Sequence, residues 1–125
     1  MTICGPEVFG YDPINIKWSV VRGDTSTIRI DFLENDEVSL FDTTGWIFKA
    51  SSYDPKTQII DELEVSSHPG YVVVTASPDI TSYWGTTYKS IVSELIFDLQ
   101  VRIDDTVWTP VIGTINVIGD ITGTI

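Results

Sequence analysis

The feature that most constrains this chain is an alternation of apolar and polar side chains that recurs along most of its length. Between residues 14 and 21, for example, positions 14, 16, 18 and 20 are apolar, whereas 15, 17 and 19 are polar. Successive side chains of a β-strand point to opposite faces of its sheet, so this period predicts half-buried strands. Such strands are expected at residues 14–21, 27–32, 46–51, 58–65, 71–76 and 94–104, and in the two runs after residue 105.

Turn-forming residues separate these runs at spacings of about 8 to 12 residues, as they do in all-β folds. The run Tyr71–Ala76 is rich in β-branched residues and is expected to be buried on both faces. Only residues 77–85 resemble a helix, because Ser77 suits a cap and Pro78 the first helical position. This piece is short and is expected to cross between sheets. The turns are expected at Glu34–Glu37, at Asp54-Pro55, at His68-Pro69-Gly70 and at Asp104-Asp105.

Seven to nine short strands without a long helix predict an all-β fold. We expect an antiparallel, immunoglobulin-like β-sandwich, and an open barrel of similar strand count is the alternative. The Cys…Trp…Cys signature of antibody domains is absent because Cys4 is the only cysteine. The predicted organisation is an extended N-terminal arm at residues 1–13, a β-sandwich domain at 14–118 and a C-terminal tail at 119–125.

The charge and the apolar content restrict the class of partner. Acidic residues outnumber Lys and Arg 18 to 7, for a formal charge of −11, so nucleic acid would be repelled over most of the surface. The N-terminal sequence MTICGPEVFGYDP has neither a basic region nor a long apolar run, and no later run approaches ~18 apolar residues. We therefore expect a soluble product with no nucleic acid or membrane partner.

The residues that usually carry catalysis are scarce. His68, the only histidine, is expected to be a solvated turn residue, and Cys4 lies in the predicted arm, far in sequence from any base. The carboxylates fall mainly in turns or on solvated strand faces, and none of the acidic turns completes a calcium-binding loop. We expect no enzyme, no catalytic residue, no cofactor and no metal site; calcium bound by turn carboxylates is the alternative.

Two groups of aromatic residues are candidates for binding. Phe9 and Tyr11 are apolar side chains that could anchor the predicted arm to a partner protein. Tyr83 and Trp84, with Tyr88 nearby in sequence, could instead form a platform on which a sugar stacks, although aromatic residues near strand ends more often fill the core or an interface. The predicted partner-binding residues are thus Phe9, Tyr11, Tyr83 and Trp84, and the alternative function is a carbohydrate-binding or adhesin module for a host glycan.

The tripeptide Arg22-Gly23-Asp24 matches a motif that integrins recognise. It lies between two predicted strands, where Gly23 can adopt positive φ and Asp24 can accept a backbone hydrogen bond. Integrin binding requires the tripeptide at the tip of a long loop in a protein that meets animal cells, and nothing else in the sequence indicates that setting. We therefore interpret Arg22-Gly23-Asp24 as a bend between strands.

Four stretches occur in an order that resembles a family of small β-sandwich domains in tailed-phage virion proteins. They are VVRGDTSTIRIDF, SLFDTTGWIFKASSYDP, GYVVVTASPDITSYWGTTY and SELIFDLQVRIDDTVWTPVIGTINVIGDIT. Together they resemble the N-terminal domain of the baseplate upper proteins, and the resemblance spans roughly Ile16 to Thr122. The chain departs from that pattern at Thr43-Thr44-Gly45, where the family commonly has Leu-Thr-Gly, and in the arm before Ile14.

The resemblance implies a structural role in a bacteriophage virion. It implies contacts with other virion subunits, assembly as a homo-oligomer within the particle, and a protein made in the host cytoplasm. It leaves open whether the substructure is baseplate, tail, fibre attachment or capsid decoration. No catalytic residue is carried over from it.

Overall fold

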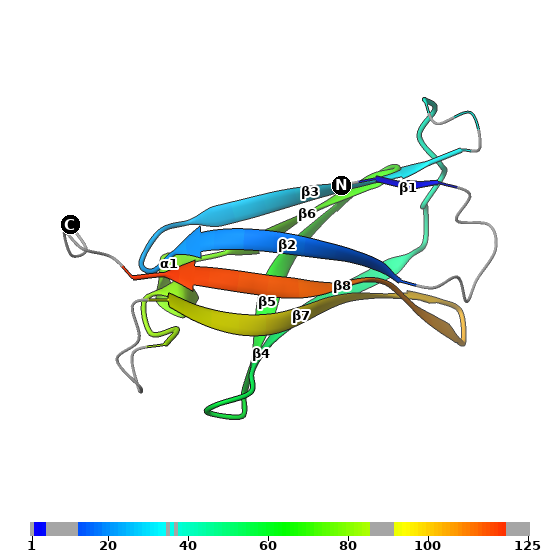
Figure 1. Cartoon of the computed structure of the whole chain (residues 1–125). Helices are drawn as coiled ribbons and strands as arrows, with labels where there is room; N and C mark the ends of the chain where they lie inside the picture. Colours follow the sequence, from blue (N-terminus) through cyan, green and yellow to red (C-terminus); the bar gives the residue numbers. More distant parts are fainter. Residues whose placement is uncertain (1, 5–12, 35, 37, 86–91, 120–125) are drawn as a thin grey trace.

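The computed structural model describes residues 2–4, 13–34, 36, 38–85 and 92–119. These residues form eight strands and one short helix (Figure 1). The strands are β1 (Thr2–Cys4), β2 (Ile14–Val21), β3 (Ser26–Leu33), β4 (Ile47–Asp54), β5 (Ile59–His68), β6 (Tyr71–Ala76), β7 (Val92–Ile103) and β8 (Thr106–Ile118), and the helix is α1 (Pro78–Thr81). The predicted all-β fold and the predicted number of strands are confirmed.

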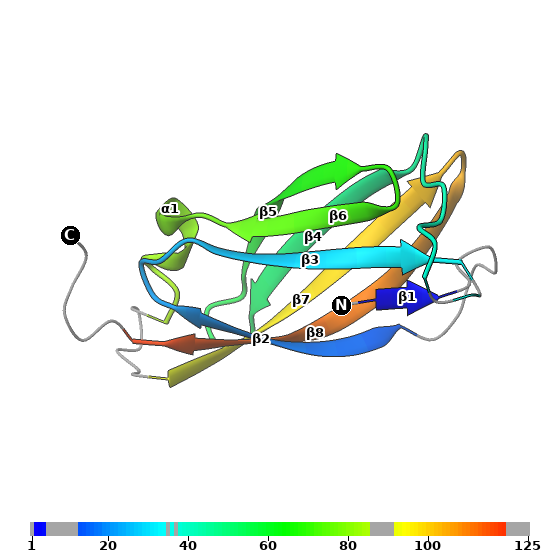
Figure 2. The same cartoon turned by 90° about the horizontal axis from the view of Figure 1, so that it is seen from above.

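All eight strands belong to one sheet, in the order β1-β3-β6-β5-β4-β7-β8-β2. Figures 1 and 2 show that the sheet curls around the interior, with β1, β3 and β6 on one side and β7, β8 and β2 on the other. The sheet is therefore close to a barrel, and its two edge strands, β1 and β2, are consecutive in the chain. Of the two architectures expected from the sequence, the open barrel describes this sheet better than the immunoglobulin-like sandwich.

The expectation of a purely antiparallel sheet is wrong. The first two strands pair in parallel, β1 with β3 through Thr2–Cys4 and β2 with β8 along its whole length. The other five strand pairs are antiparallel, so the sheet is mixed. Alternation of side chains reports which face of a strand is buried but not which strand lies beside it, and so it could not distinguish the two directions.

One strand, β5, belongs to both sides of the barrel. Residues 59–63 of β5 pair with β4, whereas residues 64–68 pair with β6. The change of neighbour takes place at Leu63, whose side chain is buried. Because β5 changes partner halfway along its length, it joins the two sides of the sheet through a continuous strand.

The core is the inner face of the curled sheet. Burial alternates along β2, β6 and β7, and the inward side chains of β2 include Trp18, which packs edge-on against Phe97 with ring centroids 5.7 Å apart. In β6 one face is fully buried and the other is half-buried, so the expectation of burial on both faces is only partly met. The fully buried large side chains are Phe32, Phe97, Ile30, Leu95, Leu99, Ile115, Val20, Val72, Val74, Val101, Val111 and Val117.

The connection between β2 and β3 is an arch between the two sides of the barrel, not a hairpin. Although β2 and β3 are consecutive, they pair with β8 and β6 respectively. Gly23 has φ of +89°, and the amide of Asp24 donates to the carbonyl of Val21 at 3.0 Å. The predicted bend at Arg22-Gly23-Asp24 is confirmed.

Local turn and helix signals were also informative. α1 begins at Pro78, as predicted, and it connects β6 to the opposite side of the barrel. The carboxylate of Asp54 accepts a hydrogen bond from the amide of Lys56 at 2.9 Å, which is the expected bond two residues along the turn. Asp104 has φ of +53° in the hairpin between β7 and β8. Among the described residues, no helix has the length and apolar character needed to cross a membrane.

Candidate functional site

The end of the barrel that carries α1 is held by a network of hydrogen bonds to the Arg22-Gly23-Asp24 arch. The hydroxyl of Thr81 is fully buried; it accepts from the amide of Gly23 at 3.2 Å and donates to the carbonyl of Asp24 at 2.9 Å. The Nε of Arg22 donates to the carbonyl of Trp84 at 2.6 Å. All these contacts use backbone atoms of the arch or the guanidinium of Arg22, so the tripeptide acts as a structural joint.

Tyr83 and Trp84 meet on a single carboxylate of β5. The phenol of Tyr83 donates to one oxygen of Asp61, and the indole Nε1 of Trp84 donates to the other at 3.3 Å. Burial, followed by the hydrogen bond and the charge of Asp61, raises the pKa of Tyr83 to about 12. Asp61 therefore ties both aromatic side chains to β5.

This arrangement places two of the four predicted partner-binding residues. The side chain of Trp84 is only 2% exposed, so its ring faces the core and offers no flat surface to a sugar, whereas Tyr83 is 39% exposed. Phe9 and Tyr11, and Tyr88 of the suggested aromatic platform, lie outside the described residues. The sequence indicated that Tyr83 and Trp84 belong together, but it did not indicate Asp61, which is more than 20 residues away.

His68 forms part of a stack of side chains on the outer face of β3, β5 and β6. Its ring lies parallel to that of Tyr71 with centroids 4.6 Å apart, and the guanidinium of Arg29 lies 3.8 Å from the centroid of the same tyrosine. The hydroxyl of Ser66 and the Nε2 of His68 are 2.9 Å apart. Within the described residues no carboxylate is hydrogen-bonded to this imidazole, so the pair lacks the orienting group of a catalytic triad.

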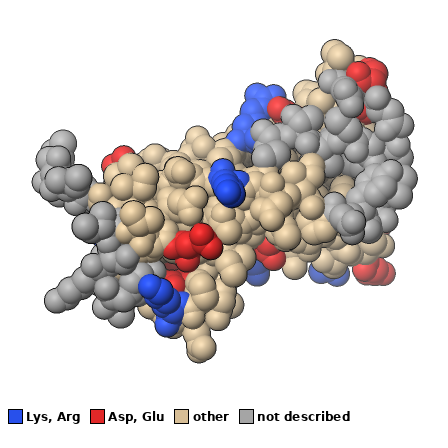
Figure 3. All heavy atoms as spheres, in the orientation of Figure 1, with Lys and Arg blue, Asp and Glu red and all other residues tan. Residues whose placement is uncertain are grey.

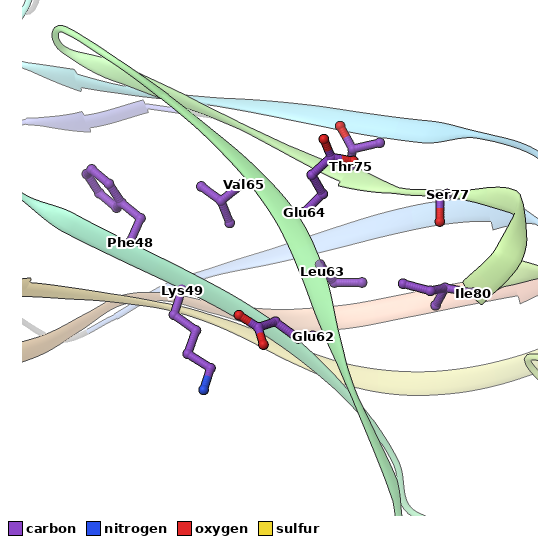
Figure 4. Close-up of a pocket in the computed structure, with 9 residues that line it drawn as sticks. All are labelled: Phe48, Lys49, Glu62, Leu63, Glu64, Val65, Thr75, Ser77 and Ile80. Carbon is purple, nitrogen blue, oxygen red and sulfur yellow. The ribbon is translucent and has the colours of Figure 1, made fainter.

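An open depression of about 430 Å³ lies where β5 leaves β4 and turns toward β6. Figure 4 shows that Phe48 and Val65 lie on one side of the β4 ribbon, whereas the charged ends of Lys49 and Glu62 lie on the other. The depression is lined both by charged side chains and by apolar side chains that also pack on the core. No group of three or more metal-ligating side chains occurs in this depression or elsewhere in the described parts of the chain.

A group of exposed apolar residues lies on the outer face of β4, β5, β7 and β8. A groove of about 250 Å³ there is lined by Tyr53, Ile60, Ile96 and Ile112, and we call these four residues the outer patch. Ile60 is 70% exposed and Ile96 47% exposed. The strand register explains the cluster, because Tyr53 lies opposite both Ile60 and Ile96, and Ile112 lies opposite Asp98, which also lines the groove.

The sequence contains a signal for the outer patch, namely apolar residues at positions where the alternation calls for polar ones. Ile96 lies between Leu95 and Phe97, at a position where the period calls for a polar residue. Ile60 and Ile112 likewise follow directly on Ile59 and Val111. Such departures from the alternation mark apolar residues on the solvent face of the sheet.

A second exposed element is the edge of the sheet at β2. Among the described residues, β2 pairs only with β8, which leaves the other side of this strand without a strand partner over residues 14–21. Figure 3 has the orientation of Figure 1 and shows that the side of the molecule with β2 and β8 is mostly uncharged, with scattered charged side chains. This surface contrasts with the strongly acidic composition of the chain.

Comparison with known proteins gives matches among solved structures. No protein-family model and no curated protein matches the sequence. Among solved structures, the chain is similar to the N-terminal domain of phage TP901-1 ORF48, with 12% sequence identity and a TM-score of 0.43. The similarity covers 95% of this chain and 94% of that chain. This structural neighbour is a domain of a phage protein.

Proposed function

We propose that this chain is a non-enzymatic structural protein of a bacteriophage virion, which joins other subunits through its N-terminal arm and a sheet edge. The observation that carries the proposal is the edge of β2, on which no strand of the described residues pairs. An eight-residue edge strand presents a row of backbone donors and acceptors, and in other proteins such edges are covered, blunted or paired with another chain. The protein would thus work by adding its sheet to that of a neighbour.

The other edge of the sheet supports the role of the N-terminal arm. Thr2–Cys4 adds in parallel to β3 at Asp31 to Leu33, so this end of the chain already behaves as an extended segment that adds to a sheet edge. Residues 26–30 of β3 have no strand partner on that same side within the described residues. Edge strands of this kind are suited to pairing between subunits of an assembly.

The phage setting of the proposal comes from the order of motifs between Ile16 and Thr122. The residues behind that resemblance form the arch at Gly23, the turn at Gly45, the hairpin at Gly70 and the long strands β7 and β8. These are the turns and strands that define the barrel. They support a common architecture with virion domains. The sheet edges described above are the surfaces through which such a domain would contact other subunits.

Purified phage particles test the proposal. The protein is expected to remain with particles through a density gradient, as measured by mass spectrometry, and a variant that lacks residues 1–13 is expected to fold but to be lost from them. Within the described residues, the strand pairing that the deletion removes is the three residue pairs between β1 and β3, so the far-ultraviolet circular dichroism of the domain should persist. Absence of the wild-type protein from purified particles would show that the proposal is wrong.

The alternative function, binding of a host glycan, has weaker support in the geometry. A stacking platform needs an exposed aromatic face, but Trp84 is buried and donates to Asp61, and Tyr71 has His68 and Arg29 against its ring. A glycan array on the purified chain separates the two functions. Binding that Tyr83→Ala abolishes would favour the glycan.

A further inference from the structure

The outer patch is an apolar surface on a highly charged protein. Tyr53, Ile60, Ile96 and Ile112 come from four different strands and surround one groove. Single exposed apolar residues are common on proteins, but a contiguous group around a groove is typical of a surface that binds another protein.

One acidic side chain in this groove, Asp98, restricts the charge of the partner that the groove can bind. Asp98 lies in β7 between Ser51 of β4 and Ile112 of β8, next to the isoleucines of the patch. It is half-buried, and burial raises the pKa of its carboxyl group. No ion pair found within the described residues involves Asp98, and burial accounts for the raised pKa of its carboxyl group. A carboxylate that is partly removed from water and has no ion-pair partner is stabilised when a binding protein supplies one.

The charge of the chain argues against a second copy as the occupant. Each copy carries a formal charge of −11, so two copies repel one another, and a symmetric contact through the groove would bring two Asp98 carboxylates together. The basic side chains nearest to the patch in the register, Lys49 and Lys17, lie opposite Gln100 and Thr114 and not opposite Asp98. The charge of the chain and the carboxylate of Asp98 in the groove therefore favour a partner that brings a Lys or Arg side chain.

We propose that the outer patch binds a different protein, through a segment in which a Lys or Arg side chain pairs with Asp98 and neighbouring aliphatic side chains fill the groove between Tyr53, Ile60, Ile96 and Ile112. This inference rests on the proposed role in a virion, because it takes the partner to be another subunit of the particle. It adds a second contact surface, distinct from the β2 edge. The aliphatic contacts supply affinity, and the ion pair fixes the orientation of the partner.

Photo-crosslinking in assembled particles identifies the partner directly. A benzophenone amino acid replaces Ile96, and the cross-linked peptide is sequenced by mass spectrometry. The expected product joins position 96 to a different virion protein, at a segment with a Lys or Arg within a few residues of the cross-link. A cross-link to another copy of this chain, to an acidic segment, or to no protein would overturn the inference.

Charge variants supply the second arm of the test. Asp98→Lys is expected to lower incorporation into particles by about tenfold or more, and Asp98→Asn to lower it less, because an amide can still accept a hydrogen bond. Asp105→Lys is the matched control, because this substitution makes the same change of charge in the exposed hairpin that follows β7. Circular dichroism confirms that each variant is folded.

The outcomes separate the two proposals. If wild-type protein is present in particles and Asp98→Lys is incorporated as well as Asp105→Lys, the inference about the patch is wrong while the virion role stands. If wild-type protein is absent from particles, the virion role itself is wrong.

Discussion

The Nε of Arg22 donates a hydrogen bond to the main-chain carbonyl of Trp84 across 2.6 Å, although 62 positions separate the two residues. This bond ties the arch between β2 and β3 to the segment that follows α1. It gives the arginine of the Arg22-Gly23-Asp24 tripeptide a structural role.

Arg22→Ala is expected to lower the free energy of unfolding by about 1.5–3 kcal/mol, because a charged, partly buried donor is lost and a carbonyl is left without it. Urea denaturation followed by tryptophan fluorescence measures the change. Asp24→Glu is the control: Asp24 contributes its backbone to the arch, through its amide and its carbonyl, so this change should leave stability nearly unaltered. Equal losses for the two variants would contradict a structural role specific to Arg22.

Gly113→Ala is expected to destabilise the contact between β2 and β8. A Cβ atom at residue 113 would lie 2.3 Å from the carbonyl oxygen of Ile16 and 2.7 Å from the ring of Phe97. Overpacking of this kind costs about 1–3 kcal/mol or more, and here it also forces two paired strands apart. Thermal unfolding by circular dichroism provides the measurement.

Gly45→Ala serves as the comparison for Gly113→Ala. Gly45 has φ of +84° and no atom within 4 Å of a Cβ atom, so its substitution carries only a backbone cost of about 1–2 kcal/mol. If steric contact governs the result at Gly113, the Gly113 variant should also change the fluorescence of Trp18, which packs on Phe97, whereas the Gly45 variant should not.

Asp98→Asn is expected to change how stability depends on pH. Because burial raises the pKa of Asp98 in the folded chain, the unfolded chain releases this proton first, and stability falls as pH rises from the ordinary value of 3.8. Removal of the ionisable group should make the variant at least as stable as the wild type at pH 7, with an advantage that shrinks as pH falls toward 3.8. Denaturant titrations from pH 3 to pH 8 provide the comparison, with Asp105→Asn as the control for loss of one negative charge. If the stability advantage of Asp98→Asn over the wild type grew as the pH fell, it would contradict a raised pKa of Asp98.

Asp61→Asn is expected to lower the pKa of Tyr83 from about 12 part of the way toward 10. The change is partial because burial, the larger cause, remains when the charge of Asp61 is removed. Since the raised pKa favours the neutral phenol in the folded chain, stability should decline as pH rises above 10. Absorbance at 295 nm follows tyrosine ionisation, and subtraction of the Tyr83→Phe titration isolates this residue. An unchanged midpoint would show that Asp61 does not act on Tyr83.

Much of the barrel could be predicted because its information is local. The alternation between residues 14 and 21 gave the bounds of β2 and its buried face, since one strand with one wet face is enough to produce that pattern. Pro78 marked the start of α1, and Asp54 marked its turn through a bond within two residues. In each case the relevant contacts lie within a few positions of the signal.

The rest depends on contacts that no local pattern contains. The parallel pairing of β2 with β8 joins Ile14 to Val111, and nothing near either residue specifies the direction of the other strand. Asp61 meets Tyr83 only because β5 and the segment after α1 reach the same end of the barrel. The outer patch arises in the same way, from isoleucines that are ordinary in each strand and become a surface only in register.

The parallel pair β2 and β8 also determines how the protein bears mechanical load. The chain enters β2 at Ile14, beside Val111, and leaves β8 at Ile118, beside Val21, so the entry and exit points lie at opposite ends of one strand pair (Figure 1). Tension between these points pulls the two strands past each other along their length. All eight residue pairs then resist together in shear, instead of opening one after another from an end. A chain held at these two points within an assembly would therefore carry the load along the length of this strand pair.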